Sequence, residues 1–373
     1  MRIPVLLPVL ACLFVVPAGA RSGERFSFNG QLSGWAEFND ESLDTTEVGV
    51  RYIPEVRLLQ PLDGGAELDA VVSVDAYAAP VVEDMSDIDD RSDVDLYRLW
   101  AKYSTGKFDA RVGLQKINFG PAKLLRSLMW FDSLDVRDPL QLTDGVYGAL
   151  ARYWFVDNAK VWVWGLYGND DPKGREVVGT DEDEPEFGGR FQFPVPAGEM
   201  AFSGHHRQID RDEWNELLEV ELEDGGEDRF GMEGQWDMVV GLWFEAVAEE
   251  IEIGSGQRYW RRFLTLGGDY TFESGLHVLC EHGRQSEGSK AKRTDMQFDV
   301  TAFMADYRYG VVDSFTGIAY YNWDDEETYW YLGWRRTYDN WRLDVSVFSA
   351  ADEGDVEETF AGNGLQLMLT FNH

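Results

Sequence analysis

The stretch "VGVRYIPEVRLLQPLDGGAELDAVVSVDAY" (residues 48–77) alternates apolar and polar side chains on both sides of a short turn. A period of two residues is typical of a β-strand that turns one face away from water. The turn "PLDGG" is short and contains glycine, as hairpins require. The stretch therefore predicts a β-hairpin whose apolar face consists of Val48, Val50, Tyr52, Pro54, Val56, Leu58, Leu68, Ala70, Val72, Val74 and Ala76.

The same pattern recurs along the chain. Seven further tight turns are predicted at 104–107, 156–159, 194–199, 236–239, 272–275, 309–314 and 337–340. Longer polar connections alternate with them near 40–46, 79–93, 119–144, 169–185, 209–227, 252–258, 286–295, 323–328 and 351–361. Together they join about 18 strands of about 10 residues each. Residues 214–226 also alternate, and an assignment of this segment as a strand of its own would change the count by two. A barrel of 16 strands is a further alternative.

The regular alternation of long and short connections decides between β architectures. Outer-membrane β-barrels have short periplasmic turns and longer extracellular loops, whereas a β-sandwich follows no such rule. Aromatic residues make up 14% of the chain and gather toward strand ends, as Trp154, Trp164 and Trp334 do, which fits interfacial girdles. We therefore predict an all-β fold, a transmembrane antiparallel β-barrel with both chain ends in the periplasm. A soluble β-protein is the alternative.

The first 20 residues resemble a secretory signal peptide. An apolar run leads to the small residues Ala18–Ala20, which predicts cleavage before Arg21. Cys12 suggests a lipoprotein alternative, but Val9 stands where a lipobox has leucine. No later stretch of 18 apolar residues occurs, so the mature chain, 21–373, is expected to cross a membrane only with β-strands.

The net charge of −35 excludes nucleic acid as a partner, because phosphate binding needs a basic face. Acidic residues concentrate in five connections, at 83–93, 169–186, 210–228, 324–327 and 352–358. Facing the anionic phosphates of lipopolysaccharide, these loops would need divalent cations to relieve repulsion. The favoured interpretation is that they are solvated loops without a specific ion, and a specific cation site is the alternative. The expected partners are outer-membrane lipid and lipopolysaccharide; no organic cofactor is expected.

Charged residues on the strands fall mainly at one parity. A lipid-facing arginine or lysine at the bilayer centre costs about 2–4 kcal/mol, so we expect these side chains to point into the lumen. We expect the apolar residues between them to face outward, namely Tyr97, Leu99, Ala101, Phe108, Ala110, Val112 and Leu114. The residues expected inside are Arg98, Lys102, Arg111, Gln115, Arg152, Lys160, Arg190, Arg335 and Arg342. They would set solute selectivity or, alternatively, only pair with wall carboxylates such as Asp109, Glu245, Asp269 and Asp344.

The connection 119–144 is too apolar to face water. It carries Leu124, Leu125, Leu128, Met129, Trp130, Phe131, Leu134 and Val136. We expect it either to fold into the barrel as a constriction loop or to cap a neighbouring subunit, so a homo-oligomer stays open. Pro121 and the spacing of the leucines predict a short helix over "AKLLRSLMWF". The candidate constriction residues of this connection are Lys123, Arg126, Asp132, Asp135, Arg137 and Asp138. Lys116, which lies just before the connection, is a further candidate.

The stretch around this connection, "ARVGLQKINFGPAKLLRSLMWFDSLDVRDPLQLTDGVYG", resembles porin-like outer-membrane proteins related to the alginate-export type. The resemblance rests on an R-x-G-x-Q strand, a glycine and a "WFD" element before a "DP" turn, and covers Arg111–Gly148. It implies lumen arginines that contact an anionic polysaccharide, foremost Arg111 and after it Arg126 and Arg152. The net charge of −35 differs from the charge expected of a protein that exports anions.

The sequence offers no catalytic constellation. His205 and His206 are adjacent on a strand and should point to opposite faces, which prevents joint ligation. No P-loop, GxSxG or HExxH motif occurs. We therefore expect no enzyme. The favoured function is a porin for passive or selective diffusion of small polar or charged solutes. The alternative is a closed barrel that serves as an adhesin or scaffold through its acidic loops.

Overall fold

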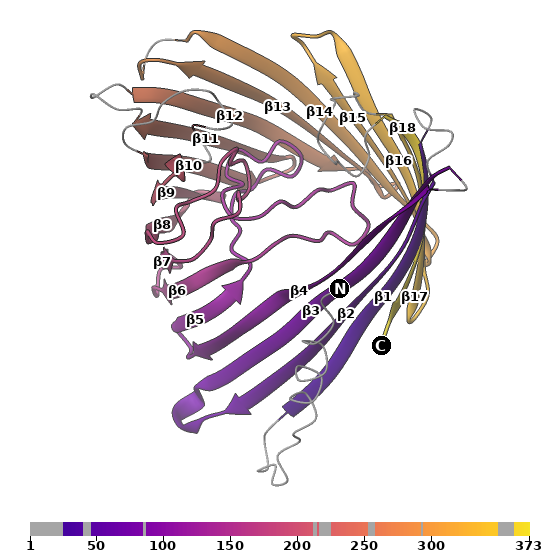
Figure 1. The fold of residues 1–373 in the computed structure, drawn as a ribbon. Helices are drawn as coiled ribbons and strands as arrows, with labels where there is room; N and C mark the ends of the chain where they lie inside the picture. The colour runs from indigo at the N-terminus through magenta and orange to yellow at the C-terminus, as the bar shows by residue number, and fades with distance from the viewer. Residues whose placement is uncertain are drawn as a thin grey trace.

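The computed structural model describes residues 25–39, 46–84, 87–211, 215, 225–252, 258–291, 294–349 and 362–373. These residues form one antiparallel sheet of 18 strands, in which consecutive strands pair and β1 pairs with β18. Closure leaves no free sheet edge, so the backbone groups of the strands are satisfied by their neighbours. The predicted barrel with about 18 strands is therefore confirmed (Figure 1).

The strands are β1 (Arg25–Asn39), β2 (Thr46–Pro61), β3 (Glu67–Asp84), β4 (Asp87–Ser104), β5 (Phe108–Gln115), β6 (Val146–Trp154), β7 (Lys160–Leu166), β8 (Glu186–Val195), β9 (Gly198–Gln208), β10 (Gly226–Asp237), β11 (Gly241–Glu252), β12 (Arg258–Thr271), β13 (Leu276–Gly288), β14 (Met296–Tyr309), β15 (Asp313–Asn322), β16 (Glu327–Thr337), β17 (Trp341–Ser349) and β18 (Asn363–Asn372). A 3₁₀ turn, η1 (Asp63–Gly65), lies in the first tight turn.

All eight predicted tight turns join the strands expected on either side of them. Arg25 pairs with Leu59 beside the first of these turns, and Phe371 pairs with Trp341 beside the last. The start of β1 and the end of β18 therefore lie at the tight-turn end of the barrel. His373 exchanges backbone hydrogen bonds of 3.0 Å with Gly30, so the residues after Phe371 extend the closing pair.

Two of the expected long connections are short. β3 and β4 continue through the predicted connection 79–93, and Val82 still pairs with Ile88. The connection 323–328 is reduced to 323–326, because β16 begins at Glu327. Acidic residues are tolerated in such paired extensions if these rise into water above the membrane. Most of 209–227, including most of the candidate extra strand, and all of 351–361 lie outside the described residues.

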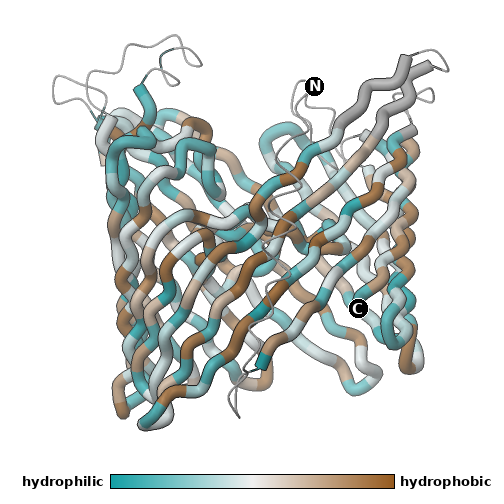
Figure 2. Tube along the Cα trace, turned by 60° about the horizontal axis from the view of Figure 1, so that its bottom comes forward, coloured by the Kyte–Doolittle hydropathy of each residue, from teal (hydrophilic) through white to brown (hydrophobic). Residues whose placement is uncertain are grey.

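The outer face of the barrel carries many exposed apolar side chains. Phe26, Val112 and Leu332 are 58%, 60% and 53% exposed, and each lies on the face that strand alternation turns away from the lumen. Apolar and polar residues alternate along the tube in Figure 2. No helix in the described ranges is long and apolar enough to cross a membrane.

Candidate functional site

The connection between β5 and β6 runs through the interior of the barrel (Figure 1). The carboxylate of Glu245 on β11 accepts hydrogen bonds from the backbone N–H groups of Ala122 and Leu128, both 2.9 Å long. Glu281 on β13 accepts three more, from residues 123, 124 and 125, at 2.7, 2.9 and 2.6 Å. The segment 122–128 therefore lies against the inner wall.

These hydrogen bonds explain why the predicted helix over "AKLLRSLMWF" is wrong. The segment consists of bends and turns without a helix. Its N–H groups donate to wall carboxylates instead of to carbonyls four residues earlier, and charge-assisted bonds are the stronger choice. Tertiary contacts have overridden the local spacing of the leucines.

The apolar side chains of this loop are buried inside the barrel. Phe119 lies 5.4 Å from the ring of Trp130 and 5.8 Å from that of Trp164 on β7. Phe131 meets Trp164 edge to face at 5.6 Å. The loop residues that form this cluster with the wall also include Ile117 and Leu128. This apolar packing, aromatic at its centre, occupies the lumen along β6, β7, β11 and β12.

Two further contacts carry the loop across the barrel. The carbonyl of Pro139 accepts hydrogen bonds from Arg342 on β17, at 2.9 Å, and from Arg335 on β16, at 3.4 Å. Arg98 on β4 donates to the carbonyl of Thr143 at 2.7 Å. The loop thus contacts the wall at β11–β13, at β16–β17 and at β4.

A second connection, between β7 and β8, also enters the lumen. Within the predicted outward acidic segment 169–186, Lys173 and Val178 are only 7% and 1% exposed. Glu176 forms ion pairs with Arg207 on β9, at 3.0 Å, and with Arg229 on β10, at 2.8 Å. The prediction that this segment is a solvated outer loop is wrong for its first half, because buried wall arginines attract it inward.

The sequence held one signal for this second loop. Residues 173–178, "KGREVV", place two basic and two apolar residues around Glu176 inside an otherwise acidic connection. That composition is atypical of a purely solvated acidic loop. The partners on β9 and β10 were nevertheless not predictable, because pairing between distant charges is not encoded locally.

The wall cations predicted to line the lumen differ in their partners. Arg152 forms two hydrogen bonds of 3.0 Å with Asp109, and Arg335 and Arg342 share Asp344. Arg190 is buried and pairs with Glu233. The expected pairing with wall carboxylates therefore applies at Asp109 and Asp344. It does not apply at Glu245, which binds loop N–H groups, or at Asp269, which contacts His277.

Arg111 is different. Its guanidinium lies over the ring of Trp100 at 4.5 Å. Its Nε atom is buried without a hydrogen-bond partner among the described residues. A lumen guanidinium stacked on an indole keeps its positive charge directed toward the passage.

The loop candidates are mostly paired with one another. Arg126 forms an ion pair of 2.8 Å with Asp132, and Arg137 one of 2.8 Å with Asp135. Asp138 accepts hydrogen bonds of 2.8 Å from the N–H groups of residues 140 and 142, and burial raises the pKa of its carboxyl. These pairs make the loop rigid in itself.

Two outward predictions on β4 and β5 are wrong. The register between β3 and β4 shifts next to Tyr97, which lines an inner cavity beside Arg98 instead of facing lipid. Leu114 is 6% exposed and lines the same cavity. It follows Gly113, whose φ of 119° is a conformation that favours glycine. A bulge or an irregular residue reverses the inside-outside alternation after it.

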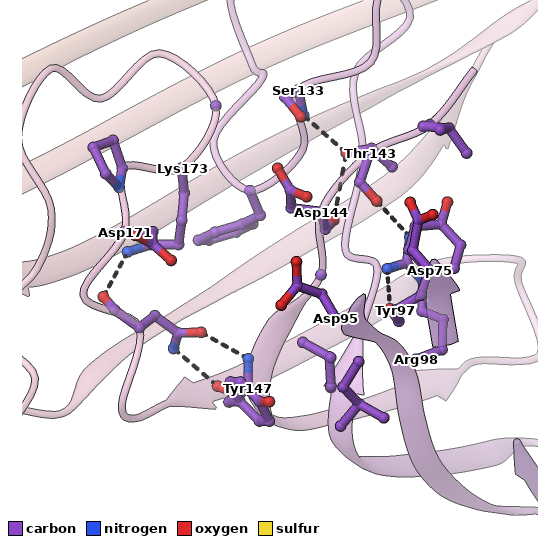
Figure 3. Close-up of a pocket in the computed structure, with 18 of the residues that line it drawn as sticks. Asp75, Asp95, Tyr97, Arg98, Ser133, Thr143, Asp144, Tyr147, Asp171 and Lys173 are labelled. Carbon is purple, nitrogen blue, oxygen red and sulfur yellow. Dashed lines mark hydrogen bonds between the residues drawn. The ribbon is translucent and has the colours of Figure 1, made fainter. Parts of the chain in front are cut away.

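Two cavities lie between the loops and β2–β5. The upper cavity, of about 580 Å³, lies toward the long connections and is lined by Asp75, Asp95, Asp144, Asp170 and Asp171 with Arg51, Arg98 and Lys173 (Figure 3). The lower cavity, of about 340 Å³, lies toward the tight turns and is lined by Arg57, Arg98, Lys102, Arg111 and Lys116 with Glu55 and Asp69. Arg98 lines both.

The two cavities therefore carry opposite charge. Acidic side chains outnumber basic ones in the upper cavity, and basic ones outnumber acidic ones in the lower cavity. Burial lowers the pKa of Lys116, in the loop that follows β5. A third cavity, of about 490 Å³, lies on the other side of the loop and is lined by Lys123, Arg126, Arg137, Arg175 and Tyr320 among others.

The histidines do not meet in one site. His205 is 4% exposed and contacts Glu186 and Trp164 on the inside of the wall. His206 contacts Asp228 and lies beside the exposed Phe187 on the outside. Among the described residues, no three histidine, cysteine, aspartate or glutamate side chains are grouped to hold a metal ion.

Solved structures resemble this barrel over nearly its whole length. Its fold is the closed antiparallel β-barrel of bacterial outer-membrane proteins. OccD3 of Pseudomonas aeruginosa matches with a TM-score of 0.61 and 11% identity, covering 95% of this chain and 92% of its own. OccAB1 of Acinetobacter baumannii matches with 0.60 and 9%, covering 94% and 96%. OmpT of Vibrio cholerae, an outer-membrane protein in trimer form, matches with 0.51 and 9%, covering 94% and 100%.

These likenesses are structural. No family model and no curated protein matches the sequence. The porin-like part of the resemblance at Arg111–Gly148 agrees with the shared fold. A closed 18-stranded barrel with an apolar outer face fits the outer membrane of a bacterium.

Proposed function

We propose that this protein is an outer-membrane porin through which small polar or charged solutes diffuse. The observation that carries the proposal is the pair of lumen cavities along β2–β5, which share Arg98 as a lining residue. A solute that moves along this wall leaves one cavity and enters the next at a single side chain. No covalent chemistry is needed, because filtering by size and charge suffices.

The charges of the two cavities support a selectivity. Aspartates surround the upper cavity, and Arg57, Lys102, Arg111 and Lys116 line the lower one. A plain cation would be held above and a plain anion below. A polar or zwitterionic solute interacts favourably with both regions in turn. We therefore propose such solutes as the preferred cargo, with Arg98 and Arg111 as the main contact residues.

We further propose that residues 119–144 act as the constriction loop. Support comes from its contacts with the wall at Glu245, Glu281, Arg342 and Arg98. A loop that is hydrogen-bonded to the wall at several points narrows the passage, and thermal motion of the loop does not close it. The loop residues Lys123, Arg126, Asp132, Asp135, Arg137 and Asp138, with Arg152, Arg190 and Arg335 on the wall, complete the proposed lining.

Four expectations join this proposal. Residues 1–20, which lie outside the described part of the chain, would be a signal peptide. Lipopolysaccharide would surround the outer rim, with divalent cations at the acidic loops. The trimer form of OmpT suggests a homo-oligomer here. The resemblance of Arg111–Gly148 to the alginate-export type makes an anionic saccharide one solute to test.

Planar bilayer reconstitution tests the proposal. The expected result is stepwise ion conductance from the wild-type barrel, with larger steps after deletion of residues 121–138. Absence of conductance from both proteins, each shown to be folded, would contradict a porin. Binding of cells or polymer without conductance would instead support the adhesin or scaffold function.

A further inference from the structure

Two buried glutamates of the wall hold the constriction loop by its backbone. We propose that Glu245 and Glu281 are positioning residues that set the aperture of the channel, because they fix the path of residues 120–128. This inference rests on the proposed porin function for its effect on conductance. The hold on the loop itself can be measured separately.

The first argument is the compensation of buried charge. Glu245 and Glu281 are 1% and 0% exposed, and within the described part of the chain neither forms an ion pair. Taking an ionised carboxylate out of water is costly unless it is hydrogen-bonded. Five loop N–H groups supply that compensation, and Trp243 adds its indole N–H to Glu281 at 3.0 Å. Moving the loop away would leave two buried charges poorly satisfied.

The neighbouring buried glutamates show that this is a special arrangement. Glu227 pairs with Arg207 and Arg229, and Glu249 pairs with Arg261. Arginines of the wall neutralise the charges of these two glutamates. Glu245 and Glu281 use the backbone of residues 122–128 instead, which ties their charge to the position of the first loop.

The backbone of the loop also approaches the carboxylate of Glu245 closely. Gly120 has a φ of 98°, and a Cβ atom there would lie 2.3 Å from the Oε1 atom of Glu245. Only glycine allows this approach. On β12, between the two glutamate strands, the hydroxyl of Thr265 donates to the carbonyl of Leu125 at 2.6 Å. Three adjacent strands thus each contribute a contact to the same loop segment.

The hydrogen bonds from residues 122–128 to Glu245 and Glu281, here called the clamp, also affect the lining of the lumen. Lys123 and Arg126 belong to the clamped segment and line the third cavity. Their side chains keep their place only while the backbone between them is held. Loss of either carboxylate would therefore change both the width and the charge of the passage.

Hydrogen exchange followed by mass spectrometry tests the hold directly on the folded full-length barrel. Glu281→Gln should speed exchange of amides 123–125 roughly tenfold or more, because each loses a charge-assisted bond. Glu245→Gln should do the same at amides 122 and 128. Thr265→Val, which keeps both carboxylates, should loosen the segment less. Glu37→Gln is the matched control, since Glu37 contacts Gln366 on β18; it should leave the loop unchanged.

The two parts of the inference fail in distinguishable ways. Unchanged exchange at 122–128 in both glutamine variants would overturn the clamp. Faster exchange with unchanged conductance would overturn its control of the aperture. If exchange is faster but neither the wild type nor the variants conduct ions, the porin function fails and control of the aperture fails with it. The clamp on the loop would still stand in that case. Faster exchange with altered step size and increased current noise is the expected result.

Discussion

The guanidinium of Arg98 donates a 2.7 Å hydrogen bond to the carbonyl of Thr143, which joins the β4 wall to the end of the inward loop. Arg98 also lies 3.9 Å from the ring centre of Tyr97, at the register shift of β4. The side chain of Arg98 thereby holds the loop, contacts the ring at the register shift and lines both the upper and the lower cavity. This position makes it the natural boundary between the two charged regions of the passage.

Arg98→Gln should raise single-channel conductance. The shorter side chain opens the boundary between the cavities and removes one bond to the loop. Single-channel recording in planar bilayers measures the change. Lys107→Gln, a substitution of an exposed turn residue outside both cavities, is the control. A conductance equal to that of the wild type would place the narrowest point elsewhere.

Arg111→Ala should shift the reversal potential across a salt gradient toward that of a cation-preferring channel. The stacked guanidinium is a fixed positive charge in the lower cavity, and its loss lowers local anion concentration. Arg336→Ala, which contacts Asp313 near a tight turn, provides a comparison outside the lower cavity. If the two variants behave alike, Arg111 has a structural function only.

The permeability of the channel to anions relative to cations should fall at alkaline pH before free lysine would titrate. Burial lowers the pKa of Lys116 below its ordinary value of 10.5, so its ammonium loses its proton earlier as the pH rises. Permeability ratios recorded at increasing pH measure this step. Lys116→Met should abolish it and give a low anion preference at every pH. Persistence of the step in that variant would assign it to another group.

Glu176→Gln should destabilise the barrel by about 3–5 kcal/mol, because it leaves Arg207 and Arg229 with less compensation in a buried cluster. Denaturant unfolding in lipid vesicles measures the loss. Glu182→Gln, in the exposed part of the same loop, should change stability by less than about 0.5 kcal/mol. Equal effects of both substitutions would mean that the second loop is not anchored through Glu176.

The strand part of the fold was predictable from local sequence. Alternation in β2 and β3, and glycine-bearing turns such as 62–66, depend on neighbours two residues apart. The apolar character of 119–144 also indicated a buried loop, and the segment has buried side chains at Leu128, Trp130 and Phe131. These features follow from solvent preference, which composition reports directly.

Other features were not predictable. The leucine spacing at 124–128 predicted a helix, yet carboxylates more than 100 residues away took its N–H groups. Alternation placed Tyr97 outside, and a single register shift placed it inside. Acidic charge predicted an outer position for the connection 169–186, yet wall arginines hold Glu176, and its neighbours Lys173 and Val178 are buried.

The sequence by itself determined an antiparallel barrel, its turns and the one strongly apolar loop, because each depends on side chains close together in the chain. Only the tertiary structure decided how the lumen is divided. The cavities, the two-glutamate clamp and the boundary at Arg98 arise where strands far apart in sequence face the same loop. Their hydrogen bonds and buried charges exist only after the barrel has closed around it.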